Sequence, residues 1–148
     1  MNVMTLTIVL NMEMDKVLMC YHNKQRMHNF IGGHVNEGEP GMDASYRELL
    51  EETGITSDDV DLQFVRLEKA SSPLYDPYEL FITCGVLKNR VKLHQEKNIL
   101  NWVYIKDVDL ISDQTFGMGN CLVYLREAVT ILGMEHLLPI LAVGPRPD

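Results

Sequence analysis

The sequence predicts an α/β fold in which a mixed sheet lies between helices. From Met4 to Leu10 every second residue is a large apolar one, the alternation of a half-buried strand. Pro40 and Gly41 mark the start of a helix at residues 41–53, and Gly54 marks its end. Leu122, Leu125, Val129 and Leu132 recur at helical spacing. Strands before and after a central helix are typical of a mixed sheet packed between helices.

The same patterns predict the other elements. Polar and glycine- or proline-containing segments mark turns, and β-branched or alternating runs mark strands. The expected order is a turn at Asn11–Asp15, a strand at Lys16–His22, a polar loop at Asn23–His28, a lead-in at Asn29–Ile31, strands at Asp61–Leu67 and Tyr78–Leu87, and a short strand at Asn101–Ile105. Between the two longer strands, we expect the segment Ser71–Pro77 to form a loop that borders a substrate pocket.

Length and charge limit the class of protein. The chain has 148 residues, which predicts one domain over residues 1–148. A net charge of −8 disfavours binding to DNA or RNA, which requires basic surface. The apolar runs are far shorter than a membrane span, and the first residues lack a signal-peptide pattern, so we expect no membrane partner. Three separated cysteines favour reduced buried thiols in the cytoplasm.

The segment from Gly33 to Ile55 contains the strongest functional pattern. In a helix each residue advances about 100°, so Glu51 lies roughly 60° to one side of Glu48 and Glu52 roughly 40° to the other. Three carboxylates therefore share one helix face. Arg47 precedes Glu51 by one helical turn, close enough to pair with it or to hold Glu39 from the preceding loop.

The charge of this segment indicates a bound cation. It carries six carboxylates against one arginine, a net charge of −5. Like charges three or four residues apart on a helix repel one another by a few tenths of a kcal/mol per pair. Carboxylate oxygens favour hard ions, so Mg²⁺ is the first expectation and Mn²⁺ the second. An isolated Glu-Leu-Leu-Glu-Glu run would more often be a solvated acidic helix face than a metal site.

Nine specified positions over 23 residues favour the metal site, and they resemble the Nudix box. The matched positions are Gly33, Glu39, Arg47, Glu48, Leu49, Glu51, Glu52, Gly54 and Ile55. The resemblance implies a Nudix α/β/α sandwich in which a loop–helix–loop carries the catalytic residues. It also implies hydrolysis of a nucleoside diphosphate linked to another group.

The resemblance assigns roles to individual residues. Glu48, Glu51 and Glu52 would ligate the metal with the Gly32 carbonyl, and Glu52 or Glu51 would activate water. Glu39 and Arg47 would form an orienting ion pair, while Gly33 and Gly54 would occupy tight backbone positions. The stretch Gln95–Trp102 is similar to a segment that supplies a further carboxylate in many members, so Glu96 is a candidate ligand or base; as an alternative, it is a surface residue beside Lys97.

The substrate is less well defined by the sequence. The lead-in His28–Gly33 is similar to that of oxidised-purine triphosphatases of the MutT-like type, in which an Asn reads the purine edge. On that mapping Asn29 would contact the base; as an alternative, it would bond its own backbone. His28, Phe30 and Ile31 depart from the pattern. Phe30 and Tyr75 are candidates to stack a base, and His34 is a candidate to contact phosphate.

Three functions follow from these residues. The first is a Mg²⁺-dependent pyrophosphohydrolase that converts a nucleoside triphosphate, ordinary or oxidised, to monophosphate and pyrophosphate. The second is a pyrophosphatase of ADP-ribose or a nucleotide sugar. The third is a non-catalytic nucleotide sensor, which is disfavoured because every box carboxylate is present. An RNA-end pyrophosphohydrolase is disfavoured by the net negative charge of the chain. The sequence is consistent with a monomer or a homodimer.

Overall fold

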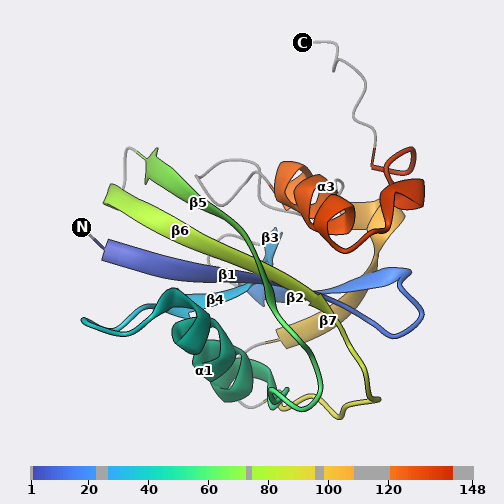
Figure 1. Cartoon of the computed structure of the whole chain (residues 1–148), viewed down its shortest axis with the longest axis horizontal. Coiled ribbons are helices and arrows are strands. Elements are labelled where there is room, and N and C mark those ends of the chain that lie inside the picture. The colour runs from blue at the N-terminus through green and yellow to red at the C-terminus, as the bar shows by residue number, and fades with distance from the viewer. Residues whose placement is uncertain (1, 23–26, 73–74, 96–98, 109–120, 142–148) are drawn as a thin grey trace.

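Seven strands form one sheet that is covered on its two faces by different helices (Figure 1). The structure is a computed structural model that describes residues 2–22, 27–72, 75–95, 99–108 and 121–141. The strands are β1 (Asn2–Leu10), β2 (Lys16–His22), β3 (Met27–Asn29), β4 (Ile31–His34), β5 (Gln63–Ser72), β6 (Tyr75–Val86) and β7 (Ile99–Tyr104). The helices are α1 (Gly41–Thr53), α3 (Cys121–Ile131) and the short 3₁₀ turns η1 (Ile105–Asp107) and η3 (Glu135–Leu137).

The sheet is mixed, as the sequence predicts. Its main order is β3-β2-β1-β6-β5, with β4 also paired to β1 and β7 to β2. The central strands β1 and β6 run parallel, with Leu6 opposite Ile82, and the other strand pairs are antiparallel. A chain with this order and with helices on both faces is an α/β sandwich, which confirms the predicted fold class.

The alternation in β1 divides the core into two layers. Leu6, Ile8 and Leu10 pack with residues of α3, whereas Val9 packs with Leu49 of α1 on the other face. Figure 1 shows α3 above the sheet and α1 below it. Because both faces are covered, the central strand is buried on both sides, which is typical of strands in layered α/β folds.

Helix α1 begins and ends where the sequence predicts. Pro40 precedes it in an extended conformation, and Gly54 ends it with φ 83°, a left-handed conformation that favours glycine. The Gly54 N–H donates to the Leu50 carbonyl at 2.9 Å. None of the helices in the described ranges is long and apolar enough to cross a membrane.

Two predicted loops were partly wrong. The segment Ser71–Pro77 was expected to be a loop, but β5 extends to Ser72 and β6 begins at Tyr75. The polar loop expected at Asn23–His28 contains the start of β3, which pairs with β2. In both cases cross-strand pairing overrides the local preference of serine, asparagine and proline for turns.

Candidate functional site

Arg47 of α1 connects the loop, the strand and the helix of the predicted box. Its Nε and Nη2 donate to the two carboxylate oxygens of Glu39, each at 2.9 Å. Its Nη1 donates to Glu48 at 2.9 Å and to Glu51 at 3.3 Å. Its Nη2 also donates to the backbone carbonyl of His34 at 2.9 Å, which ties the helix to the end of β4.

The Glu39 carboxylate is fixed from two sides. The bidentate contact with Arg47 holds one side, and the Asn36 N–H donates to its Oε1 at 3.1 Å. These hydrogen bonds, that of Arg47 first, lower the pKa of Glu39. Glu39 therefore stays ionised and restrains the guanidinium, as expected of an orienting ion pair.

The side chain of Glu48, a residue of α1, lies against the backbone of Gly33 in β4. A Cβ built on Gly33 would be 2.1 Å from the Glu48 Cδ, so the carboxylate occupies the space that any larger residue would need. The side chain of Glu48 is buried, and this burial raises its pKa. The charges of Glu51 and Glu52 also raise the pKa, whereas Arg47 lowers it.

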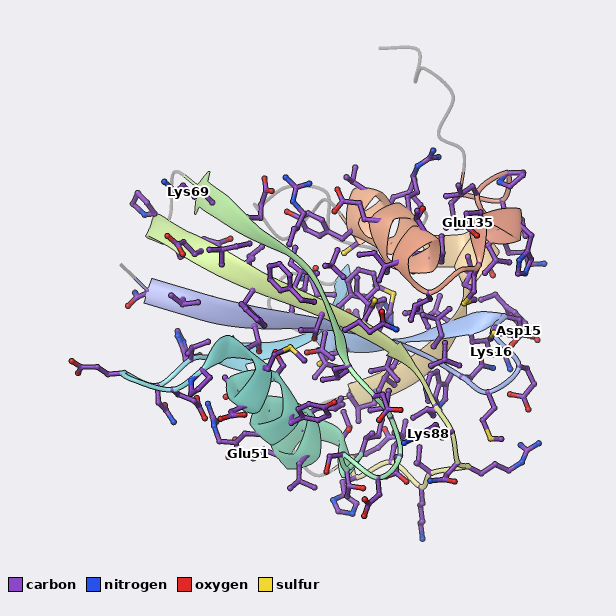
Figure 2. The ribbon with its side chains drawn as sticks, viewed as in Figure 1. Asp15, Lys16, Glu51, Lys69, Lys88 and Glu135 are labelled. Atoms are coloured by element: carbon purple, nitrogen blue, oxygen red, sulfur yellow. The ribbon has the colours of Figure 1, made fainter. Side chains whose placement is uncertain are left out.

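Glu51 and Glu52 flank Glu48 on different sides. Glu51 is exposed, and Figure 2 places it on the side of α1 that faces away from the sheet. Glu52 is half-buried and lies close enough to Cys20 of β2 for its charge to act on that thiol. Burial first, and then the Glu52 charge, raise the pKa of Cys20 to about 11. The two carboxylates therefore bracket the buried one, as helical spacing predicts.

The donor set fits a divalent cation by its chemistry. Within the described ranges, no three acidic, histidine or cysteine side chains already converge as a preformed ligand cluster. Glu48 and Glu51 instead share the Nη1 of Arg47. Three carboxylates at one helix face, with a raised pKa at the central one, are nonetheless an arrangement that a hard cation would stabilise.

Asn29, at the end of β3, is almost completely buried. Its Oδ1 accepts a hydrogen bond from the Cys121 thiol at 3.6 Å. Its Nδ2 has no hydrogen-bond partner among the residues that the structure describes. A buried amide donor without a partner costs about 1–3 kcal/mol, so a water or bound molecule that accepts a hydrogen bond from it would stabilise this position.

The other predicted substrate residues are distributed differently. Phe30 is buried in the core layer beneath α3, and the His34 side chain is exposed beside the carbonyl that Arg47 binds. The side chain of Tyr75 and the whole of Glu96 lie outside the described residues. Gly32 lies on β4, opposite Leu6 of β1, directly before Gly33.

Sequence reasoning missed the contact of Cys121 with Asn29. It interpreted Cys121 only as a core residue, and 92 positions separate the two side chains. No local pattern signals such a contact, because it depends on how α3 is placed across the sheet.

A cavity of about 190 Å³ lies away from the box. It is formed by the β1–β2 turn, the segment after β6 and one residue of β7. Its lining residues are Asn11, Met12, Glu13, Lys16, Leu87, Asn89, Arg90, Val91 and Trp102. Trp102 is half-buried there and also contacts the core layer beneath α1.

Comparison with known proteins establishes the family. A model of the NUDIX domain matches residues 1–117. The chain therefore belongs to the Nudix family, whose hydrolases act on nucleoside diphosphate-linked substrates and generally use a divalent metal. A sequence comparison with curated proteins found no match.

Solved structures share the fold at low sequence identity. A Caenorhabditis elegans Ap4A hydrolase complex is 18% identical, with a TM-score of 0.74 over 90% of this chain and 98% of that one. The Escherichia coli dihydroneopterin triphosphate pyrophosphohydrolase is 16% identical, with a TM-score of 0.71 over 86% and 95%. A MutT structure from work on Aliivibrio salmonicida and Vibrio cholerae is 22% identical, with a TM-score of 0.66 over 87% and 98%.

Proposed function

We propose that this Nudix hydrolase converts nucleoside triphosphates, ordinary or oxidised, to nucleoside monophosphate and pyrophosphate. The observation that supports this substrate class is the buried Asn29 amide, whose Nδ2 has no hydrogen-bond partner in the described ranges. Nucleobase edges carry carbonyl oxygens and ring nitrogens that accept a hydrogen bond from such a donor. A bound base would thus satisfy a group that is otherwise buried at a free-energy cost.

The residues of the box have distinct proposed roles. Glu48, Glu51 and Glu52, with the Gly32 carbonyl, would hold a divalent cation, Mg²⁺ first and Mn²⁺ second. When bound, that cation would neutralise charge on the phosphate oxygens and make a nearby water more acidic. Arg47 orients Glu48 and Glu51 through its own pairing with Glu39. Glu52 or Glu51 would then accept the proton from the attacking water as general base.

The reaction then follows from these positions. Water oxygen attacks one phosphorus in line with the bridging oxygen, the phosphoanhydride bond breaks, and the bridging oxygen leaves with the other phosphate group. Glu96, three residues before Ile99 in the sequence, is proposed to supply an additional carboxylate to the same site. We expect only a small-molecule nucleotide as partner, without DNA or RNA.

A second candidate substrate is ADP-ribose or another nucleotide sugar. The box residues determine that a phosphoanhydride bond is cleaved. They do not determine which group is linked to the nucleoside diphosphate. A nucleotide sensor without turnover is the alternative from another class, and the intact set of box carboxylates disfavours it.

A product-resolved hydrolysis screen with Mg²⁺ tests these proposals. The panel contains ordinary and 8-oxo nucleoside triphosphates, ADP-ribose, nucleotide sugars and dinucleoside polyphosphates, with Glu52→Gln and Glu51→Gln as low-activity references. Pyrophosphate release from triphosphates would support the proposal. Turnover of ADP-ribose alone would replace it with the second candidate, and tight binding without turnover would favour the sensor.

A further inference from the structure

Strand β5 forms an open edge of the sheet. In the described part of the chain it pairs only with β6 and ends the main strand order. Figure 1 shows it at the margin of the sheet, and Figure 2 places Lys69 near its far end. An edge strand presents backbone N–H and C=O groups that a further strand can pair with.

The side chains of this edge include exposed apolar groups. Phe64 and Leu67 each retain 50% of their accessible surface. Leu67 lies opposite Phe81 of β6, and the Phe64 ring centroid is 5.0 Å from that of Phe81. These two residues therefore extend the apolar side of the β5–β6 hairpin outward to the free edge.

Two residues of opposite charge flank Leu67 on this strand, and Lys69 follows them. Arg66 and Glu68 flank Leu67 and form an ion pair with each other. Arg66 also contacts Glu127 of α3 at 2.6 Å. Irregularities in the β5–β6 register lie between Phe64 and Arg66 and between Ala70 and Ser72, so the regular stretch from Arg66 to Ala70 contains both charged residues.

We propose that a second copy of this chain pairs antiparallel with β5 about a two-fold axis at Leu67. In that register Leu67 faces Leu67 of the second copy, and Arg66 faces Glu68 of the second copy on both sides of the axis. An axis at Arg66 or at Glu68 would instead place two like charges directly opposite, which is destabilising. An axis at Lys69 would do the same, so among axes at residues 66–69 the charges favour the one at Leu67. The same surface of both copies then forms the contact, as in a two-fold dimer.

The strength expected of this dimer is modest. The regular stretch between the two irregularities is short, so few backbone hydrogen bonds form across the axis. Interfaces at the low end of the size range form transient complexes. The dimer should therefore dissociate on dilution, and its formation does not depend on nucleotide hydrolysis.

Sedimentation velocity over a concentration series of the full chain tests the association. We expect the sedimentation coefficient to rise from the monomer value towards the dimer value between about 1 and 100 µM. Leu67→Lys should remain monomeric throughout, because it places two ammonium groups opposite each other. Ile99→Lys, which changes a side chain of equal exposure (49%) on β7, should associate like the wild type.

Cysteine cross-linking tests the register. Directly opposite residues in an antiparallel pair have Cβ atoms about 4.5–5.5 Å apart, near the span of a disulfide. Leu67→Cys should give a covalent dimer under mild oxidation with copper–phenanthroline. Phe64→Cys should not, because the two copies of residue 64 would lie about 20 Å apart. The wild type is the blank, since Cys20, Cys84 and Cys121 are all buried.

The outcomes separate clearly. Circular dichroism and thermal melting confirm that each variant is folded. A wild type that stays monomeric at the highest concentration overturns the proposal, as does association of Leu67→Lys. Equal cross-linking of Phe64→Cys and Leu67→Cys overturns the register.

Discussion

The Glu48 carboxylate lies in the space that a Cβ on Gly33 would occupy, 2.1 Å from its Cδ. Gly33→Ala should therefore displace the buried carboxylate and lower kcat/KM by about 100-fold or more, because small displacements of a catalytic group are that costly. Steady-state hydrolysis measures the loss.

A double-mutant cycle identifies the cause of that loss. If Gly33→Ala acts through Glu48, the double variant Gly33→Ala/Glu48→Gln should have the same kcat/KM as Glu48→Gln alone. Gly133→Ala is the control for glycine strain, since Gly133 has φ 74° and open space around it. Additive losses in the double variant would contradict the prediction.

Replacing Arg47 by lysine should reduce turnover while the fold persists. Lysine is a point charge and cannot reproduce the two parallel contacts with Glu39 together with those to Glu48 and His34. We expect kcat to fall by about 10- to 100-fold, with a smaller change in KM. Arg90→Lys is the matched control, because Arg90 forms an exposed ion pair with Glu13 beside the remote cavity. Wild-type kcat in Arg47→Lys would show that the guanidinium does not position the site.

Asn29→Leu should weaken nucleotide binding without weakening the fold. Removing a buried donor that lacks a partner is expected to leave the free energy of unfolding unchanged or raise it by about 1 kcal/mol. KM for a triphosphate substrate should rise at the same time. Urea unfolding and substrate titration measure the two effects. Thr83→Val is the control, because the buried Thr83 hydroxyl has a partner in Thr7 and should not affect KM. A large loss of stability in Asn29→Leu, with KM unchanged, would assign Asn29 a structural role.

Asp59 should make the stability of the protein depend on pH in the acid range. It accepts hydrogen bonds from the Thr56 N–H and hydroxyl and from the Asn89 amide, and these lower its pKa below 3.8. The unfolded chain therefore binds this proton more readily than the folded protein does. The stabilisation is present above pH 3.8 and is lost as pH falls through the folded pKa. Asp59→Asn should flatten the acid limb of a plot of unfolding free energy against pH; identical limbs would contradict the prediction.

The sequence alone predicts the helix of the box and the relative positions of its carboxylates. Pro40 and Gly54 determine the ends of α1 through local backbone preference, and helical spacing predicts the relation of Glu48 to its neighbours. The alternation in β1 likewise predicts the strand, although it predicts a half-buried one, whereas both faces are covered from Thr5 to Leu10. These features depend on residues that are close in sequence, which is why a single chain reveals them.

The features that escaped prediction depend on distant residues. The Asn29–Cys121 contact joins β3 to α3, and the Gly33–Glu48 contact depends on how α1 packs against β4. The extension of β5 and β6 through a serine- and proline-rich segment depends on pairing between the strands. In each case tertiary packing decides what local preference leaves open.

The parallel pairing of β1 with β6 has a consequence for how the protein is made. Leu6 of β1 pairs with Ile82 of β6, which lies 76 positions later in the sequence, so this parallel pair forms only after β6 has been synthesised. Pairings between such distant segments slow folding, because chain entropy is lost before the contacts form. Until then β1 can pair only with β2 and β4, and the edge that later pairs with β6 is open to other chains. Chaperone dependence during synthesis should therefore be greatest before β6 emerges.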